Sequence, residues 1–149
     1  QDLMDVCRLM ANPIHGIGRP LKIGKEEIVG LVTALEIYVE RDVEAEHRGW
    51  ETSVRTMAEA LADLPHATVT ITAADEVDRP VPRVRLAIDE QGLGTSAADI
   101  AEVLQKAEPS VRVTRFSLDE GVLILNPVCL LPGDEALVVQ ALREAWPQL

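Results

Sequence analysis

Two stretches that decide the fold read ATVTITAA at residues 67–74 and PRVRLAID at residues 82–89. Apolar and polar residues alternate in both, which is the pattern of strands with one buried and one exposed face. Beyond them the pattern changes to helical spacing and back, so the predicted order of elements is ββαββα. The later helix, two strands and helix are predicted at TSAADIAEVLQKA (95–107), VRVTRFSLD (111–119), GVLILNPV (121–128) and DEALVVQALREAW (134–146). Two ββα units predict an α+β layer with about four strands and helices on one face.

Arg83 and Arg85 stand out on the second predicted strand. Successive side chains point to opposite sides of a sheet, so the two arginines lie on the face opposite to Val84, Leu86 and Ile88. The face with the arginines is therefore not the face that the helices cover, and it meets water or another domain.

The turns around this strand carry acidic residues. Asp75, Glu76 and Asp78 precede the strand, and Asp89 and Glu90 follow it. Carboxylates grouped in this way are usually solvated surface charge. We therefore assign them no catalytic role. The helix that follows is expected to be capped by Thr95 or Ser96, because short hydroxyl side chains bond the free N–H groups of a helix start.

Residues 25–64 are predicted to form one long helix, or two nearly collinear helices. Apolar residues recur in steps of three and four from Ile28 to Leu61, until Pro65 ends the pattern. About forty residues at 1.5 Å each would make a rod of roughly 60 Å, which is too long for a compact domain of this size. The helix is therefore expected to bridge two bodies, with Gly49 as a plausible kink.

A shorter helix is predicted at about residues 2–11. It is expected to end at Asn12 and Pro13, because the residue before a proline is pushed out of the helical region, and a loop to Gly24 follows. Gln1 is not an initiator methionine, and helical spacing begins at once. We therefore expect the chain to start within a longer protein.

The composition is typical of a globular protein and argues against several classes. Of 149 residues, 47% are hydrophobic and 26% are charged, with a formal net charge of -11. No apolar run approaches the 18 or so residues of a membrane span, and no signal peptide is recognisable. We expect a soluble, cytoplasmic protein without a membrane partner. Nucleic acid is not expected as a partner, because so acidic a chain repels phosphate backbones.

The cysteines and histidines predict neither a metal site nor a nucleophile. Cys7 and Cys129 are far apart in sequence, with no histidine at ligand spacing, and are expected to pack as small apolar residues. His15, His47 and His66 share no metal spacing. No Ser/His/Asp or Cys/His arrangement supports hydrolase chemistry.

The loop GIGRPLKIGKE (16–26) collects Arg19, Lys22 and Lys25 beside glycines in an acidic chain. One interpretation is a flexible linker into the following helix. Another is an anion site, in which glycines allow close approach of the backbone, N–H groups at the helix start point outward, and Arg19 and Lys22 supply positive charge to a phosphate. The loop fits neither GxxxxGK[ST] nor GxGxxG, so neither a Walker loop nor a dinucleotide fingerprint is predicted.

Taken as a whole, the chain resembles the C-terminal third of fold-type-I pyridoxal-phosphate (PLP) enzymes. The matching stretches are GIGRPLKIGKEEIVGLVTALEIYVERDVEAE (16–46), VPRVRLAIDEQGLGTSAADIAEVL (81–104) and LILNPVCLLPGDEALVVQALREA (123–145). Within these enzymes it is most similar to the group related to bacterial selenocysteine synthase (L-seryl-tRNA selenium transferase) that includes D-glucosaminate-6-phosphate ammonia-lyase. GRPLKIGKEEIVGL (18–31) is the most specific part.

The resemblance implies three parts. Residues 1–24 would be the end of a large domain and the GRPxK loop, 25–64 a long linking helix, and 65–149 an α+β small domain. It also implies that the N-terminal large domain, which is the main binding site of PLP, is not in this chain. Enzymes of this fold are dimers or larger, so a homodimer or higher homo-oligomer is implied.

The resemblance also bears on the cofactor and the site. In these enzymes a lysine in a segment like SGGK holds PLP as a Schiff base, and none of the lysines at 22, 25 and 106 has that context. The chain alone is therefore expected to be inactive. The implied cofactor-binding residues are Gly18, Arg19 and Lys22, and the implied substrate-binding residues are His15, Arg83 and Arg85. A solvated or domain-interface role is the alternative for either arginine of the strand.

The leading hypothesis is that the full-length protein is a PLP-dependent lyase or transferase. It would perform β-elimination of the ammonia-lyase type on an amino acid or amino sugar acid, its small-molecule substrate, with the cofactor as electron sink. Selenium transfer to seryl-tRNA is disfavoured by the acidic charge. The alternative from another class is a stand-alone α+β binding or regulatory module, in which the glycine-rich loop is only a linker.

Overall fold

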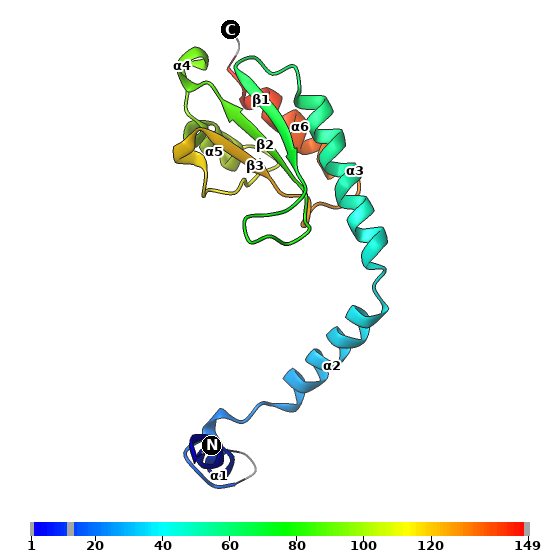
Figure 1. Ribbon diagram of the computed structural model, residues 1–149, viewed down its shortest axis with the longest axis vertical. Coiled ribbons are helices and arrows are strands. Elements are labelled where there is room, and N and C mark those ends of the chain that lie inside the picture. The colour runs from blue at the N-terminus through cyan, green and yellow to red at the C-terminus, as the bar shows by residue number, and fades with distance from the viewer. Residues whose placement is uncertain (1, 12–13, 148–149) are drawn as a thin grey trace. The chain divides into compact units, whose positions relative to one another are not determined.

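The computed structural model describes residues 2–11 and 14–147 (Figure 1). The chain divides after Asp42 into two compact units. The first unit contains two α-helices and a short 3-10 helix. The second contains the sheet and the remaining helices. Each unit is described by itself.

The first unit has α1 at Asp2–Met10, the 3-10 helix η1 at Arg19–Leu21 and α2 at Lys25–Glu40. The predicted short helix is thus confirmed, while its predicted end at residues 12–13 lies outside the described residues. No residue of α1 or α2 is buried. The apolar side chains of Val29, Leu31 and Val39 are 64%, 63% and 80% exposed. A helix with apolar residues on all sides is typical of the interior of a larger protein.

The helix predicted over 25–64 is interrupted. The helix α2 ends at Glu40, and Arg41 is extended, with its N–H donating to the carbonyl of Tyr38 at 3.3 Å. The next helix, α3, runs over Val43–Leu61, and Gly49 lies inside it. The interruption therefore falls at residues 41–42 and not at the glycine. The helix α3 belongs to the second unit, and the predicted division at residues 24 and 64 stays a prediction.

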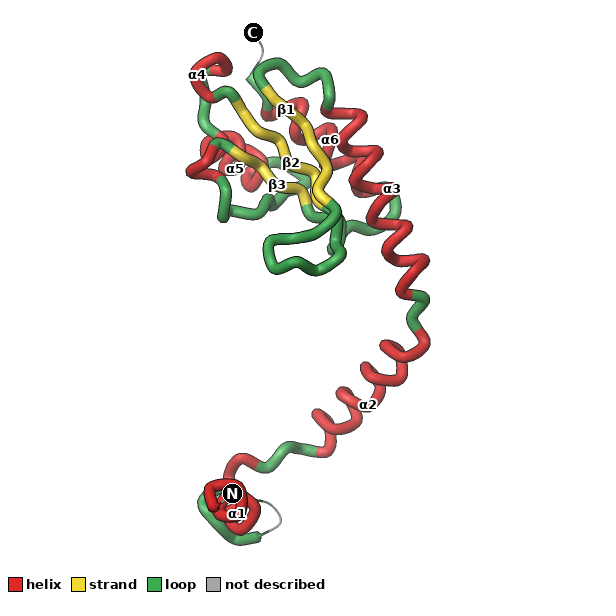
Figure 2. The backbone as a smooth tube through the Cα atoms, in the orientation of Figure 1, coloured by secondary structure: helices red, strands yellow, loops and turns green. Residues whose placement is uncertain are grey.

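An antiparallel sheet of order β1-β2-β3 forms the centre of the second unit (Figures 1 and 2). Its strands are β1 at Ala67–Thr72, β2 at Arg83–Ile88 and β3 at Val122–Leu125. The other elements are α4 at Glu90–Leu93, α5 at Ala97–Lys106, the 3-10 helix η2 at Leu118–Glu120 and α6 at Asp134–Ala145. Figure 1 shows α5 and α6 behind the sheet, so the face toward the viewer carries no helix. The α+β class is as predicted.

The predicted fourth strand at 111–119 is the main error in the fold. It is reduced to a single antiparallel bridge between Thr114 and Ile124, and the described residues form a sheet of three strands. The cause is the tight return to β3. Gly121 adopts φ 71°, and the N–H of Val122 donates to the carbonyl of Ser117 at 3.0 Å. The chain thus turns back too early for a longer ladder.

The core lies between the helix-covered face of the sheet and α3, α5 and α6. In the register of the sheet Leu86 lies opposite Val69 on one side and Leu123 on the other, so their side chains share a face. The core residues with 0% exposure are Met57, Leu61, Val84, Leu86, Ala97, Leu104, Leu123 and Leu142. This confirms the prediction that Val84 and Leu86 point into the core. The indole N–H of Trp146 closes one end by donating to the carbonyl of Pro65 at 3.1 Å.

Two carboxylates secure the helix starts. Of the two predicted caps of α5, Thr95 and Ser96, the structure has Ser96. It forms a reciprocal capping box with Asp99. Asp89 caps α4 through the N–H of Gly92 at 3.1 Å and lies 3.3 Å from Nδ1 of His66. The Ser96 hydroxyl and N–H lower the pKa of Asp99. The Gly92 N–H, followed by His66, lowers the pKa of Asp89.

Acidification is expected to destabilise this unit. Because both pKa values are lower in the folded state, these carboxylates stabilise the fold above their unfolded pKa of about 4, and the contribution is lost as the pH falls through the folded pKa. The melting temperature should therefore be nearly constant from pH 7 to 5 and should fall below pH 4. The variant Asp99→Asn has no carboxylate at this position to protonate, so its melting temperature should fall less on acidification. Equal acid sensitivity of variant and parent in calorimetry would contradict this.

Candidate functional site

The predicted site residues lie in two groups, one in each unit. The first group is His15, Gly18, Arg19 and Lys22, in the loop between α1 and α2. The second group is Arg83 and Arg85 on β2. The first group forms no part of any pocket described below, so its role toward a phosphate or a substrate stays a prediction.

The glycines of the first loop are explained by packing. The N–H of Gly18 donates to the carbonyl of Met10 at 2.9 Å, at the end of α1. A Cβ atom on Gly18 would lie 2.7 Å from that carbonyl oxygen, and one on Gly16 would lie 2.7 Å from the Cα atom of Met10. Both distances are too short, so glycine is required for the close approach of loop and helix.

The start of α2 is covered by its own carboxylates. Gly24 precedes the helix and has no side chain to cap it. A Cβ atom at this position would collide with the carboxylate of Glu27 and lie 3.1 Å from that of Glu26. Negative side chains thus occupy the end of the helix that favours an anion. Around this loop His15 and Lys22 are exposed and Arg19 is half-buried.

The lysines do not fit a covalent link to PLP. Lys22, Lys25 and Lys106 are all exposed, and the ammonium group of Lys106 lies 3.2 Å from the carboxylate of Glu102. A Schiff-base lysine is buried in a pocket with a lowered pKa, which favours its neutral form. No step of a reaction is therefore assigned to a lysine of this chain.

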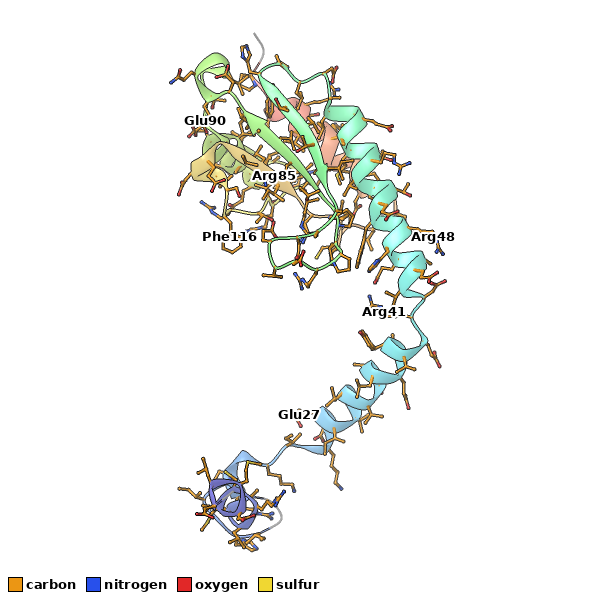
Figure 3. All side chains as sticks on the ribbon, in the orientation of Figure 1. Glu27, Arg41, Arg48, Arg85, Glu90 and Phe116 are labelled. Atoms are coloured by element: carbon orange, nitrogen blue, oxygen red, sulfur yellow. The ribbon has the colours of Figure 1, made fainter. Side chains whose placement is uncertain are left out.

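The second group lines a pocket of about 120 Å³ on the helix-free face of the sheet. Its polar walls come from Thr72 of β1, Asp75 and Glu76 of the following loop, Arg83 and Arg85 of β2, and Ser117. The register explains their meeting, because Thr72 lies opposite Arg83 and Ile124 lies opposite Arg85. Figure 3 shows Arg85 over the middle of the sheet. The predicted placement of the arginines on the face without helices is confirmed.

Arg83 is nevertheless buried, which the alternation pattern did not predict. The residue is 4% exposed, because the loop at 73–82 covers it. Its Nη1 donates to the carbonyls of Val81 and Pro82 at 3.4 and 3.2 Å, and its Nη2 lies 3.5 Å from Asp75. Its Nε is buried and has no hydrogen-bond partner in the structure. The side chain of Arg83 is therefore covered by a loop and does not face open solvent.

Asp75 organises that loop, and its prediction as solvated surface charge is wrong. Its side chain is 0% exposed. One oxygen accepts the N–H groups of Val77 at 3.1 Å and Arg79 at 2.9 Å, and the other accepts Nε of Arg79 at 2.7 Å. Burial alone would raise the pKa of Asp75, but the hydrogen bonds from the backbone and guanidinium of Arg79 outweigh it and lower the pKa. The carboxylate is therefore ionised and shared between two arginines.

Arg85 is the cation that this arrangement leaves uncompensated. It is half-buried and makes no hydrogen bond or ion pair with the described residues. Of the two guanidinium groups that line the pocket, that of Arg83 lies beside Asp75, which also pairs with Arg79, whereas that of Arg85 has no partner among the described residues. A guanidinium in this state binds a carboxylate through two parallel hydrogen bonds. The pocket is thus suited to one monoanion.

Other pockets of the second unit are less polar. One of about 310 Å³ lies between α3 and the loop at 73–82, and one of about 210 Å³ is lined by Met57, Leu125 and Val138 among others. Across the described ranges, no group of three or more His, Cys, Asp or Glu side chains is placed to hold a metal ion. None of the described helices is long and apolar enough to cross a bilayer.

The fold and the site together define an α+β domain with an arginine pocket on its open face. A scan against models of protein families finds no match. Among curated proteins, the chain is 35% identical over 134 residues to D-glucosaminate-6-phosphate ammonia lyase of Salmonella typhimurium. It is 36% identical over 145 residues to 5'-C-glycyluridine monooxygenase-decarboxylase of a Streptomyces species.

These matches cover 87% and 96% of this chain but only 34% and 35% of the relatives. The chain thus spans about a third of the length of the curated relatives it matches. A solved structure of D-glucosaminate-6-phosphate ammonia-lyase superimposes with a TM-score of 0.68 and 33% identity, over 88% of this chain and 34% of that one. The α+β fold and the resemblance to this ammonia-lyase are confirmed. Both relatives are enzymes by name, and the chain is similar to part of each.

Proposed function

We propose that the full-length protein is a PLP-dependent lyase or transferase acting on an amino acid or amino sugar acid, and that this chain binds the substrate's carboxylate. The observation that carries the proposal is the uncompensated guanidinium of Arg85 in its pocket. A guanidinium without a partner in a pocket can bind a single anionic group through two parallel hydrogen bonds. The carboxylate is the anionic group that every amino acid has.

The names of the relatives support this substrate class. D-glucosaminate is a 2-amino acid, and a glycyl group joined to uridine through carbon is another. The named reactions differ, since one enzyme is an ammonia lyase and the other a monooxygenase-decarboxylase. What the two substrates share is therefore the amino acid group and not the bond that breaks. A carboxylate-binding arginine serves either chemistry.

The cofactor is assigned to polypeptide outside this chain, since no lysine here fits it. When bound, PLP acts as an electron sink for the carbon that carries the amino group. The residues of this chain bind and orient the substrate, and Arg85 fixes its carboxylate. The phosphate contacts of Gly18, Arg19 and Lys22, the substrate contact of His15, the homo-oligomer and the cytoplasmic location belong to the same proposal.

The test is to measure ammonia and 2-keto acid release by the full-length protein, with PLP, across amino acids and phosphorylated amino sugar acids. We expect release from at least one sugar-derived 2-amino acid. We also expect visible absorbance from lysine-bound cofactor in the full-length protein but not in the 149-residue chain. Such absorbance in the chain alone would refute the assignment of the lysine. A full-length protein without cofactor binding or turnover would favour a stand-alone binding module.

A further inference from the structure

Glu76 lines the same pocket as Arg85, and the proposed carboxylate contact does not use it. Its side chain is exposed and has no hydrogen bond or ion pair with the described part of the chain. The neighbouring carboxylate of Asp75, in contrast, has its acceptor positions filled by Arg79 and Val77. Glu76 is thus the carboxylate of the pocket whose acceptor positions are unused.

The chemistry of an ionised carboxylate limits what Glu76 can receive. It accepts hydrogen bonds and donates none, so its partner must carry O–H or N–H groups. It also repels a second anion, and Arg85 is the one guanidinium of the lining without a partner among the described residues. A phosphate group therefore does not fit beside the carboxylate that Arg85 binds. A neutral hydroxyl group does fit.

The size of the pocket restricts the contact to one end of the ligand. Pockets that enclose a whole drug-sized ligand typically measure about 300–1,000 Å³. A pocket of about 120 Å³ has space for a carboxylate and the carbons next to it. A ligand whose carboxylate is bound by Arg85 would therefore place the substituents next to that carboxylate beside Glu76, while the far end of a longer ligand would lie outside.

We propose that Glu76 is a specificity-determining residue that accepts hydrogen bonds from hydroxyl groups near the carboxylate of a sugar-derived acid. This rests on the proposed function, in which Arg85 binds the carboxylate and the amino group is the reacting group. The donors that remain near the carboxylate are then the hydroxyl groups of the carbon chain. Glu76 distinguishes a sugar acid from an alkyl acid of similar length.

The experiment is an NMR titration of the isotope-labelled 149-residue chain with sodium D-gluconate and, separately, sodium hexanoate. Both ligands carry one carboxylate and six carbons, but only gluconate has hydroxyl groups. We expect gluconate to bind more tightly than hexanoate. Glu76→Gln should weaken gluconate binding about five- to tenfold, because a hydrogen bond to a charged acceptor is worth roughly 1 kcal/mol more than one to a neutral acceptor. Hexanoate binding should not weaken, because hexanoate has no hydroxyl group to lose and the variant also removes the repulsion between Glu76 and the ligand's carboxylate.

Two further variants make every outcome decisive. Arg85→Gln should remove the binding of both ligands, and Glu59→Gln, an exposed glutamate of α3 outside the pocket, should change neither. Unchanged gluconate affinity in Glu76→Gln, with binding lost in Arg85→Gln, would overturn the role of Glu76 and leave the carboxylate site standing. Unchanged affinity in Arg85→Gln, or no gluconate binding by the parent chain, would overturn both.

Discussion

Arg85→Gln in the full-length protein is expected to lower kcat/KM for its amino-acid substrate by about 10²–10³-fold. The change removes a charge-assisted pair with the substrate carboxylate in a partly enclosed pocket, and removing one partner of such a pair costs about 3–4 kcal/mol. The interaction is present before and during the reaction, so most of the loss should fall on KM. Steady-state kinetics with a sugar-derived 2-amino acid measures both parameters.

The matched control is Arg115→Gln. This arginine is exposed on the same unit and does not line the pocket. We expect its kcat/KM to stay within about twofold of the parent, because isolated surface charges contribute little. Equal losses in the two variants would show that general charge, and not the pocket, attracts the substrate. Circular dichroism of both variants tests whether the fold is retained.

Leu104→Ala is expected to lower the free energy of unfolding by about 2–5 kcal/mol. The side chain is 0% exposed in the core between α5 and the sheet, and its removal leaves a cavity. Its carbonyl also accepts the N–H of Val111 at 2.9 Å, which joins the helix to the segment that follows. Urea unfolding of the 149-residue chain, followed by circular dichroism, measures the loss.

The neighbouring residue supplies the control for this prediction. Val103 precedes Leu104 on the same helix and is 50% exposed. We expect Val103→Ala to change the free energy of unfolding by less than about 0.5 kcal/mol, as is usual for surface substitutions. Similar losses in the two variants would mean that α5 is oriented differently from the structure described above.

Much of the second unit could be predicted because its signals are local. The alternation in residues 67–72 and 83–88 and the helical spacing in residues 97–106 and 134–145 depend only on near neighbours. The interruption of the helix at residues 41–42 could not be predicted. No glycine or proline lies there, and the apolar spacing of a helix continues on both sides. The loss of the fourth strand depends on the turn at Gly121, which the alternation of apolar and polar residues does not reveal.

The candidate site was predictable to the extent that alternation determines it. The pattern places Arg83 and Arg85 on one face correctly, but it says nothing of the loop that buries one and leaves the other unpaired. Asp75 is buried because the loop folds back so that Arg79 bonds to its carboxylate. From the sequence alone, a carboxylate within a run of charged residues is expected to be solvated. The sequence signal for an ordered loop after Asp75 is the pair of prolines at 80 and 82, which restrict the backbone of the loop.

The loop centred on Asp75 has a consequence for protein engineering. A designer who transplants only the two arginines to another three-stranded sheet would obtain two mutually repelling guanidinium groups and no defined receptor. The hairpin over residues 67–88 would have to be moved together with Ser117 and Ile124, which complete the pocket, because Asp75 within the hairpin pairs with Arg79 and Arg83 and leaves Arg85 available for a guest molecule.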